Sequence, residues 1–344
     1  MSPSKDREGI TRAYQARSAF FYRRLVEMRL LDLAQKIDRL DQEMAEALDW
    51  RDLWCLGISS AAWDRVIREG LPRLRYFCHP EVLMADPTLI AYYRMIAALS
   101  QKAVSYIAFN TTRLEEGSRR ELSLAKAEQL ARLFNSTMDH LFSARFPSLQ
   151  ELQGLLFLTA GTQIDGSWRN QIGQGAERTV RRLLVGHFSE TGHLRCTVRR
   201  RDNREIPVDN VAALLADIGQ YSACVLSNGA QIVFGSEPDI TLVNPAGEVA
   251  GAIEVKGGTD PAGALERLGA AGKSFENTLE ENPSARTIYL AGVITPEAEN
   301  RLQRDRRFRS YHDLKEVLTN EVERRGFLDE VGRLLWILPT SATE

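Results

Sequence analysis

The feature that most constrains the fold of this chain is a pair of short apolar segments in its second half. Residues 239–243 and 249–255 are separated by the turn-type sequence Asn-Pro-Ala-Gly at 244–247. Short apolar segments joined by such a turn predict a β-hairpin. Alternate side chains of a strand share one face, so Glu254 and Lys256 point together while their apolar neighbours point into packing.

The segments around this hairpin predict an α/β domain. A helix is expected upstream in GAERTVRRLLVGHF, followed by strands near residues 194–198, 223–226 and 231–234. Downstream, Asp260 and Pro261 are typical of the N-cap and first position of a helix. ARTIYLAGVI then indicates a buried strand before the closing helices. This order predicts a mixed central sheet flanked by helices.

The first 160 residues are predicted to be mostly helical. Apolar residues at spacings of three and four indicate one long helix over residues 17–48, packed in its own domain or paired in a coiled coil. Further helical patterns occupy residues 60–70, 86–109, 121–144 and 148–160. We interpret the Gly-rich polar stretch 161–173 as a domain junction or loop. The expected domains are therefore a helical region over 1–160, for recognition or dimerisation, and an α/β domain over 161–344.

Composition restricts the class of protein and its compartment. The formal net charge is −2, so a nucleic-acid surface would have to be a local cluster of Lys and Arg. The four cysteines form no CxxC pair, which favours free thiols in a reducing compartment. The polar amino terminus and the absence of a long apolar run predict a cytoplasmic protein without a membrane partner.

The hairpin also carries the residues best suited to catalysis. It brings Asp239, at the start of the first strand, beside Glu254 on the second. Two adjacent carboxylates repel each other unless a divalent cation lies between them, and hard oxygen ligands favour Mg²⁺. Lys256 would then act on an attacking water or on the charge of a phosphate, an arrangement that hydrolyses phosphodiesters. The alternative is a turn residue at Asp239 and an ordinary same-face pair at Glu254 and Lys256.

The same residues resemble a known motif. Pro238-Asp239, with residues 240–253 between, and Glu254-Val255-Lys256 resemble the PD-(D/E)xK nuclease motif, and the resemblance covers about residues 165–295. In the upstream helix RNQIGQGAERTVRRLL, Glu177 stands where this superfamily often has an additional acidic residue. KGGTDPAGALERLGAAGKSFE, after the motif, and LIAYYRMIAALSQK (89–102) resemble type II restriction endonucleases like XcyI.

The resemblance implies a restriction-endonuclease-like core and a Mg²⁺-dependent, sequence-specific endonuclease for double-stranded DNA. It implies a metal held by Asp239, Glu254 and Val255, with Lys256 serving the attacking water. Glu177 would assist at a second metal or water. A surface ion pair between Glu177 and Arg181, four residues apart on a helix, explains Glu177 equally well.

DNA contacts and partners are predicted with less detail. By resemblance, Arg267, Lys273 and Ser274 lie near DNA. The arginine-rich stretches 195–204, with Arg199, Arg200 and Arg201, and 301–309 would contact phosphates or be solvated surfaces. We expect a homodimer that cuts a palindrome, with a cognate DNA methyltransferase in the same system. The alternatives are a repair or recombination nuclease of the same fold and a DNA-binding protein that no longer cleaves.

Overall fold

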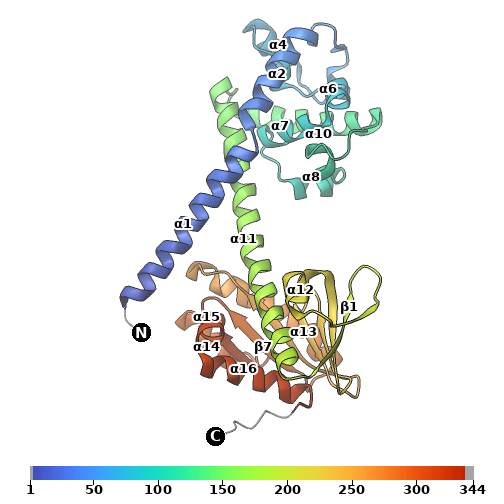
Figure 1. Ribbon diagram of the computed structural model, residues 1–344. Coiled ribbons are helices and arrows are strands. Elements are labelled where there is room, and N and C mark those ends of the chain that lie inside the picture. Colours follow the sequence, from blue (N-terminus) through green and yellow to red (C-terminus); the bar gives the residue numbers. More distant parts are fainter. Residues whose placement is uncertain (1–2, 338–344) are drawn as a thin grey trace. The chain divides into compact units, whose positions relative to one another are not determined.

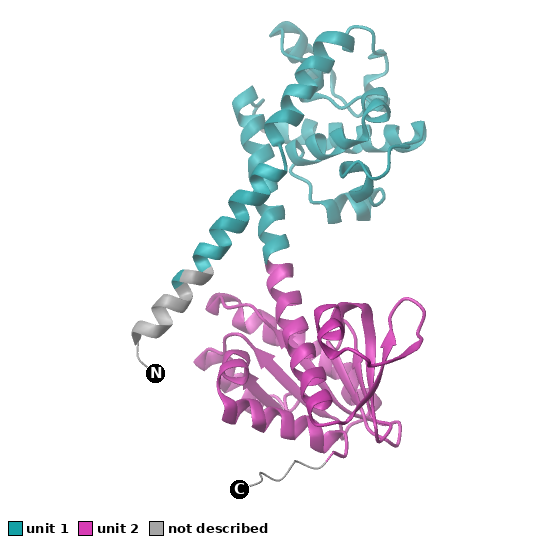
Figure 2. Cartoon of the chain, in the orientation of Figure 1, with its two compact units in different colours: residues 1–168 teal, residues 169–344 magenta. Residues whose placement is uncertain are grey.

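The computed structural model describes residues 3–337 and divides the chain into two compact units. Unit 1 is Met1–Trp168 and unit 2 is Arg169–Glu344 (Figure 2). The boundary lies inside the predicted junction 161–173. None of the helices within residues 3–337 has the length and apolar character needed to cross a membrane.

The described residues of unit 1 form helices and connecting loops (Figure 1). The helices are α1 Pro3–Glu27, α2 Leu30–Met44, α3 Leu53–Leu56, α4 Ser60–Arg68, α5 Arg73–Tyr76, α6 Pro80–Ala85, the 3₁₀ turn η1 Pro87–Leu89, α7 Ile90–Ile96, α8 Gln101–Ile107, α9 Thr112–Glu115, α10 Leu124–Ala144 and the first part of α11 Leu149–Glu190. Their apolar faces share one core, in which residues of α2, α7 and α10 are fully buried.

The predicted long helix is wrong in extent, and a second helical region is also divided. The helix expected over 17–48 is broken at Arg29, whose φ of 48° is left-handed and interrupts the helical path. The region 86–109 is divided at Ala98, with φ of 54°, into α7 and α8. In both cases the apolar period continues across the break, because the separate helices bury their faces in the same core.

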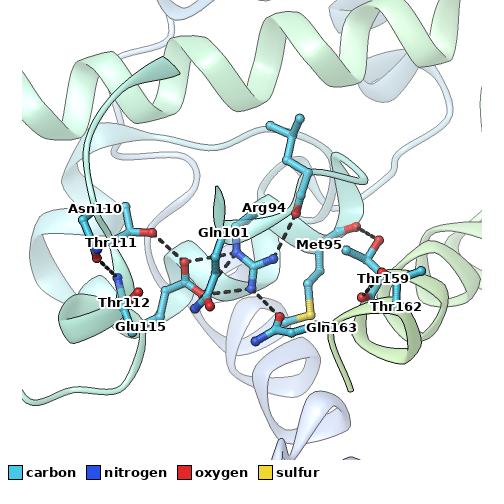
Figure 3. Close-up of polar contacts among 11 residues, drawn as sticks. Arg94, Met95, Gln101, Asn110, Thr111, Thr112, Glu115, Thr159, Thr162 and Gln163 are labelled. Carbon is cyan, nitrogen blue, oxygen red and sulfur yellow. Dashed lines mark hydrogen bonds and ion pairs between the residues drawn. The ribbon is translucent and has the colours of Figure 1, made fainter. Parts of the chain in front are cut away.

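A buried ion pair stands beside the second break. Arg94 of α7 donates to Glu115 of α9, with Nη2 2.9 Å from Oε2 (Figure 3). The Arg94 guanidinium also donates to the Leu99 carbonyl and to Gln163 of α11, at 2.9 and 3.0 Å. Thr111 donates to the Glu115 carboxylate. Since both charges are almost fully buried and each has several partners, the pair joins α7, α9 and α11 within unit 1.

The loop predicted over 161–173 is wrong, because α11 is helical throughout this stretch. Glycines disfavour a helix by about 1 kcal/mol each, which is why the sequence pattern indicates a loop. Tertiary contacts favour the helix instead. Ile164 is buried, Asp165 accepts a 2.7 Å hydrogen bond from Arg17, and the Trp168 ring lies 5.2 Å from that of Phe20.

Unit 2 is built on one eight-stranded sheet in the order β2-β1-β3-β4-β5-β6-β7-β8. The pairs from β2 to β6 are antiparallel, and β6–β7 and β7–β8 are parallel. The strands are β1 Leu194–Arg199, β2 Glu205–Pro207, β3 Tyr221–Leu226, β4 Gln231–Phe234, β5 Ile240–Val243, β6 Val249–Lys256, β7 Arg286–Ala291 and β8 Ser310–Asp313. The edge strands β2 and β8 are absent from the sequence prediction.

Helices cover both faces of this sheet (Figure 1). One core lies between the sheet and α11, α12 Val211–Ala216, the 3₁₀ turn η2 Ile218–Gln220, α15 Leu314–Thr319 and α16 Glu321–Leu334. A smaller core lies between the sheet and α13 Ala264–Glu281 and α14 Pro296–Arg304. The predicted mixed sheet flanked by helices, with a helical amino-terminal region, is confirmed.

The predicted hairpin is formed by β5 and β6. Ile240 pairs with Ile253, and the turn between the strands is closed where Gly247 donates to the Asn244 carbonyl at 2.9 Å. Gly247 has a φ of 83°, a conformation that other residues rarely adopt. Downstream, Asp260 caps the 3₁₀ turn η3 Pro261–Gly263, which leads directly into α13.

Candidate active site

The antiparallel hairpin places three charged side chains at one end of the sheet. Asp239 immediately precedes β5, while Glu254 and Lys256 lie at the end of β6. The Lys256 ammonium contacts the Glu254 carboxylate directly and lies 3.8 Å from Asp239 Oδ2. Three of the four residues predicted to be catalytic are therefore side by side.

Asp239 is buried and is held by the strand beside it. Its side chain is almost fully buried, and its Oδ2 accepts a 2.8 Å hydrogen bond from the Val255 backbone N–H. Burial, followed by the charge of Glu254, raises the pKa of the Asp239 carboxyl to about 7, although Lys256 and the Val255 N–H act in the opposite direction. Two buried carboxylates are stabilised in their charged form when a cation binds between them.

Glu254 is fixed by neighbours on two elements. It is 2% exposed and lies on the sheet face covered by α13, where Ser274 Oγ donates to its Oε2 at 3.0 Å. The Asp239 backbone N–H also points at Oε2, at 3.3 Å. The other oxygen, Oε1, faces the Lys256 ammonium. Oε2 of this carboxylate is therefore fixed by hydrogen bonds from Ser274 and the Asp239 backbone, while Oε1 faces Lys256.

The donor atoms at this end of the sheet fit a hard divalent cation. Among the described residues, no cluster of three or more His, Cys, Asp and Glu side chains could hold a metal. Asp239 and Glu254 supply two carboxylates. In an extended strand the N–H and carbonyl of one residue point the same way, so the Val255 carbonyl faces the side on which its N–H meets Asp239. Two carboxylates and one carbonyl are oxygen ligands of the kind that Mg²⁺ accepts together with water and phosphate.

Glu177 lies close to this group but bonds to another residue. Its side chain is 26% exposed, and its Oε2 is 3.3 Å from Nη2 of Arg181, one turn later in α11. The charge of Glu177 contributes to the raised pKa of Asp239, as the smallest of the causes. The predicted ion pair with Arg181 is therefore present, and a role of Glu177 in the site stays a prediction.

A glycine lets α11 approach the end of β6. A Cβ at Gly257 would lie 2.3 Å from the Ala176 Cβ and 3.1 Å from the Ile172 carbonyl. Only a residue without a side chain permits this contact. Because Gly257 directly follows Lys256, the contact fixes where α11 lies relative to the charged end of the strand.

The predicted DNA-contacting residues are dispersed over unit 2, and several have intramolecular partners. Lys273 is exposed on α13, while Arg267 donates to the Asp260 carbonyl at 2.5 Å. Arg199 and Arg201 both lie near Asp202. Arg200 donates to the Tyr221 and Phe234 carbonyls, each at 3.2 Å. In the second arginine-rich stretch, Arg307 pairs with Asp305 and Glu276. Contact with DNA stays a prediction for these residues.

Sequence reasoning did not identify two features of the site. Ser274 is buried and donates to Glu254, a contact that the sequence did not indicate. Arg181 was expected only as a partner of Glu177, but it also bonds to backbone carbonyls at the start of the hairpin. Ser274 lies twenty positions after Glu254, and no spacing rule connects them. Arg181 occupies a buried position of the helix, where an arginine is unusual, and this was the one sign that it has a particular role.

Comparison with known proteins identifies the family of this chain. The family model described as XcyI restriction endonuclease matches residues 34–316, which include most of unit 1 and the whole candidate site. The chain is also 27% identical over 275 residues to the Type II restriction enzyme XcyI of Xanthomonas campestris pv. cyanopsidis, which covers 76% of this chain and 72% of the relative. The predicted similarity to XcyI-like enzymes is confirmed. The chain therefore belongs to the XcyI restriction endonuclease family and is a type II restriction endonuclease.

Proposed function

We propose that this enzyme hydrolyses double-stranded DNA at specific sequences with Mg²⁺ held by Asp239, Glu254 and the Val255 carbonyl. Family membership itself implies DNA as the partner and a divalent metal as cofactor. The observation that supports these ligands is the convergence of Asp239, Glu254 and Lys256 at the end of one hairpin. The bound cation would supply charge stabilisation to the reacting phosphate.

The protein's own residues have distinct roles in this proposal. Asp239 and Glu254 each have a carboxylate oxygen near the Lys256 ammonium, and Ser274 keeps the Glu254 carboxylate in its orientation. Lys256 is 22% exposed at its side chain, so its ammonium reaches both the buried carboxylates and the solvent side. From there it orients or deprotonates the attacking water, or neutralises charge on the phosphate. Glu177 would assist from α11.

We further propose that the enzyme acts as a homodimer on a palindromic site. Two-fold symmetry places two copies of the site at equivalent phosphates of the antiparallel strands. Unit 1 would provide recognition or dimer contacts. A DNA methyltransferase with the same specificity would protect the host DNA. Arg199, Arg200, Arg201, Arg267 and Lys273 are proposed phosphate contacts.

The experiment that tests this function uses long duplex DNA with Mg²⁺, Ca²⁺ or EDTA. We expect discrete fragments with Mg²⁺ and binding without cleavage with Ca²⁺, whose longer, looser coordination positions water poorly. Equal cleavage in EDTA would exclude the metal mechanism. Nicking that depends on DNA structure would favour a repair enzyme, and intact DNA a binding protein.

Replacement of Lys256 tests the proposed division of roles. Lys256→Ala should lower the cleavage rate by roughly 100-fold or more, since proton transfer and charge stabilisation act on the transition state. Specific binding to DNA in Ca²⁺ should stay nearly unchanged, as measured by fluorescence anisotropy. Lys315→Ala, at an exposed lysine of α15, is the matched control. Cleavage by Lys256→Ala at the wild-type rate would refute the role of the lysine.

A further inference from the structure

We infer that Arg181 is a positioning residue for the catalytic site, acting through the backbone of the segment 235–239 that carries Asp239. The inference rests on the proposed function, because it assumes that Asp239 holds the metal. In this inference α11 positions the segment 235–239 in addition to carrying Glu177.

The contacts of Arg181 converge on this short segment. The guanidinium is on the helix face against the sheet, and the residue is 7% exposed. Its Nη2 donates to the Gly235 carbonyl at 3.0 Å and lies 3.5 Å from the Asp239 carbonyl. The same nitrogen makes the 3.3 Å contact with Glu177. Arg181 therefore binds the chain on either side of residues 236–238.

Contacts within the segment and with the end of β4 also determine its shape. The Gly235 N–H donates to the Asp239 carbonyl at 3.1 Å, which closes a narrow loop. A Cβ at Gly235 would be 2.7 Å from the Pro238 carbonyl, so the backbone is closely folded there. The Arg181 guanidinium also lies over the ring of Phe234, the last residue of β4, at 5.2 Å. Arg181 thus connects the end of β4 with the start of β5.

The energetics favour a positional role over a purely stabilising one. Burial lowers the pKa of Arg181, although the charges of Glu177 and Asp239 act in the opposite direction. The side chain is nevertheless a cation, because a guanidinium keeps its proton in proteins. Its Nε is buried and has no hydrogen-bond partner in the described residues. A buried cation with an unsatisfied donor contributes little net stability. Its buried charge and its Nη2 group, however, hold the Asp239 backbone where its carboxylate meets the Val255 N–H.

The loss of this contact should affect metal binding more than folding. Without the guanidinium, the Asp239 carbonyl keeps its hydrogen bond from the Gly235 N–H but loses the one from Arg181. The segment that carries the carboxylate is then held less firmly in the position facing Glu254. Groups that orient metal ligands typically contribute about 10- to 100-fold to metal affinity or activity. A lysine keeps the charge but lacks the planar guanidinium that lies over the Phe234 ring, so it replaces the arginine only in part.

The test compares Arg181→Met and Arg181→Lys with Arg182→Met. Arg182 is the adjacent arginine of α11 and also donates to backbone carbonyls, those of Leu215 and Ala216, but away from the site. Hydrogen exchange of residues 235–239 and the Kd for Mn²⁺ alone are measured on the full-length protein. For Arg181→Met we expect faster exchange in this segment and a Kd raised by roughly 10-fold or more. Arg181→Lys should lie between it and the wild type, and Arg182→Met should match the wild type.

Two results separate failure of this inference from failure of the proposed function. Unchanged Mn²⁺ affinity and exchange in both Arg181 variants would overturn the role of Arg181, while Asp239→Asn would still lose Mn²⁺ binding. If Asp239→Asn binds Mn²⁺ as the wild type does, the metal site itself is wrong. Should Arg181→Met fail to fold, Arg181→Lys decides, and wild-type values for both measurements would reject the inference.

Discussion

Asp239 combines a buried position with a carboxylate neighbour, and this makes the stability of the metal-free enzyme dependent on pH. Its pKa rises from the ordinary 3.8 to about 7 in the folded state. Below pH 3.8 both states are protonated. Between that value and pH 7 the folded state keeps a proton that the unfolded state has lost, so stability falls as pH rises through this range.

Asp239→Asn should remove this dependence. In EDTA at pH 8 we expect the variant to be more stable than the wild type by about 1 kcal/mol or more, with little difference near pH 3.5. Urea unfolding at the two pH values measures the effect. Mg²⁺ should stabilise the wild type at pH 8, because it binds only the folded state, and should not stabilise the variant. Parallel stability curves for both proteins would contradict the assignment.

Glu177 presents a choice between a catalytic role and an ion pair, and the structure contains features of both. Its charge reaches Asp239, and its oxygen contacts Arg181. Glu177→Gln should raise the Mg²⁺ concentration required for cleavage or lower the rate by ~10-fold, about 1.4 kcal/mol. An ion pair alone would cost only ~0.2–0.5 kcal/mol of stability and leave the Mg²⁺ titration unchanged. Glu190→Gln, at the exposed end of the same helix, is the control.

The contact between α11 and β6 determines the geometry of the site at the level of elements. Gly257 has no room for a Cβ beside Ala176, so Gly257→Ala must move the helix or the strand end. We expect a loss of about 1–3 kcal/mol of stability and a lower cleavage rate, since Lys256 is the preceding residue. Thermal unfolding and cleavage kinetics measure the two effects.

A second glycine provides the control for this change. Gly269 lies within α13 and has no atom within 4 Å of the position of a Cβ. Gly269→Ala should therefore be neutral or stabilise the protein by about 0.5–1 kcal/mol, as expected for alanine in a helix. Equal behaviour of the two variants would exclude a steric role for Gly257.

At the scale of the whole molecule, the proposed dimer requires an exposed apolar surface. In α1 of unit 1, Tyr22 is 73% exposed, and exposed aromatic side chains are enriched at protein interfaces. We expect a dimer in sedimentation equilibrium with DNA that contains the site, and weaker dimerisation in Tyr22→Lys. Val322→Lys, at an equally exposed position of unit 2, should leave the dimer intact. A monomer bound to DNA would contradict the two-fold model.

The sequence by itself determined those features of this protein that arise from interactions between residues close together in the chain. The alternation in β6 places Glu254 and Lys256 on one face, and the turn at 244–247 brings Asp239 to their end of the sheet. Asp260 caps the 3₁₀ turn that leads into α13. These features are readable because strand period, turn chemistry and capping each act over a few residues.

Only the tertiary structure decided the features that depend on contacts between distant residues. The helix through 161–173 overrides its glycines because Arg17 and Phe20 pack against it. Ser274 meets Glu254, and Arg181 meets the Gly235 carbonyl, only after α13 and α11 lie on opposite faces of the sheet. Such contacts follow no sequence period, since packing rather than local propensity brings their partners together.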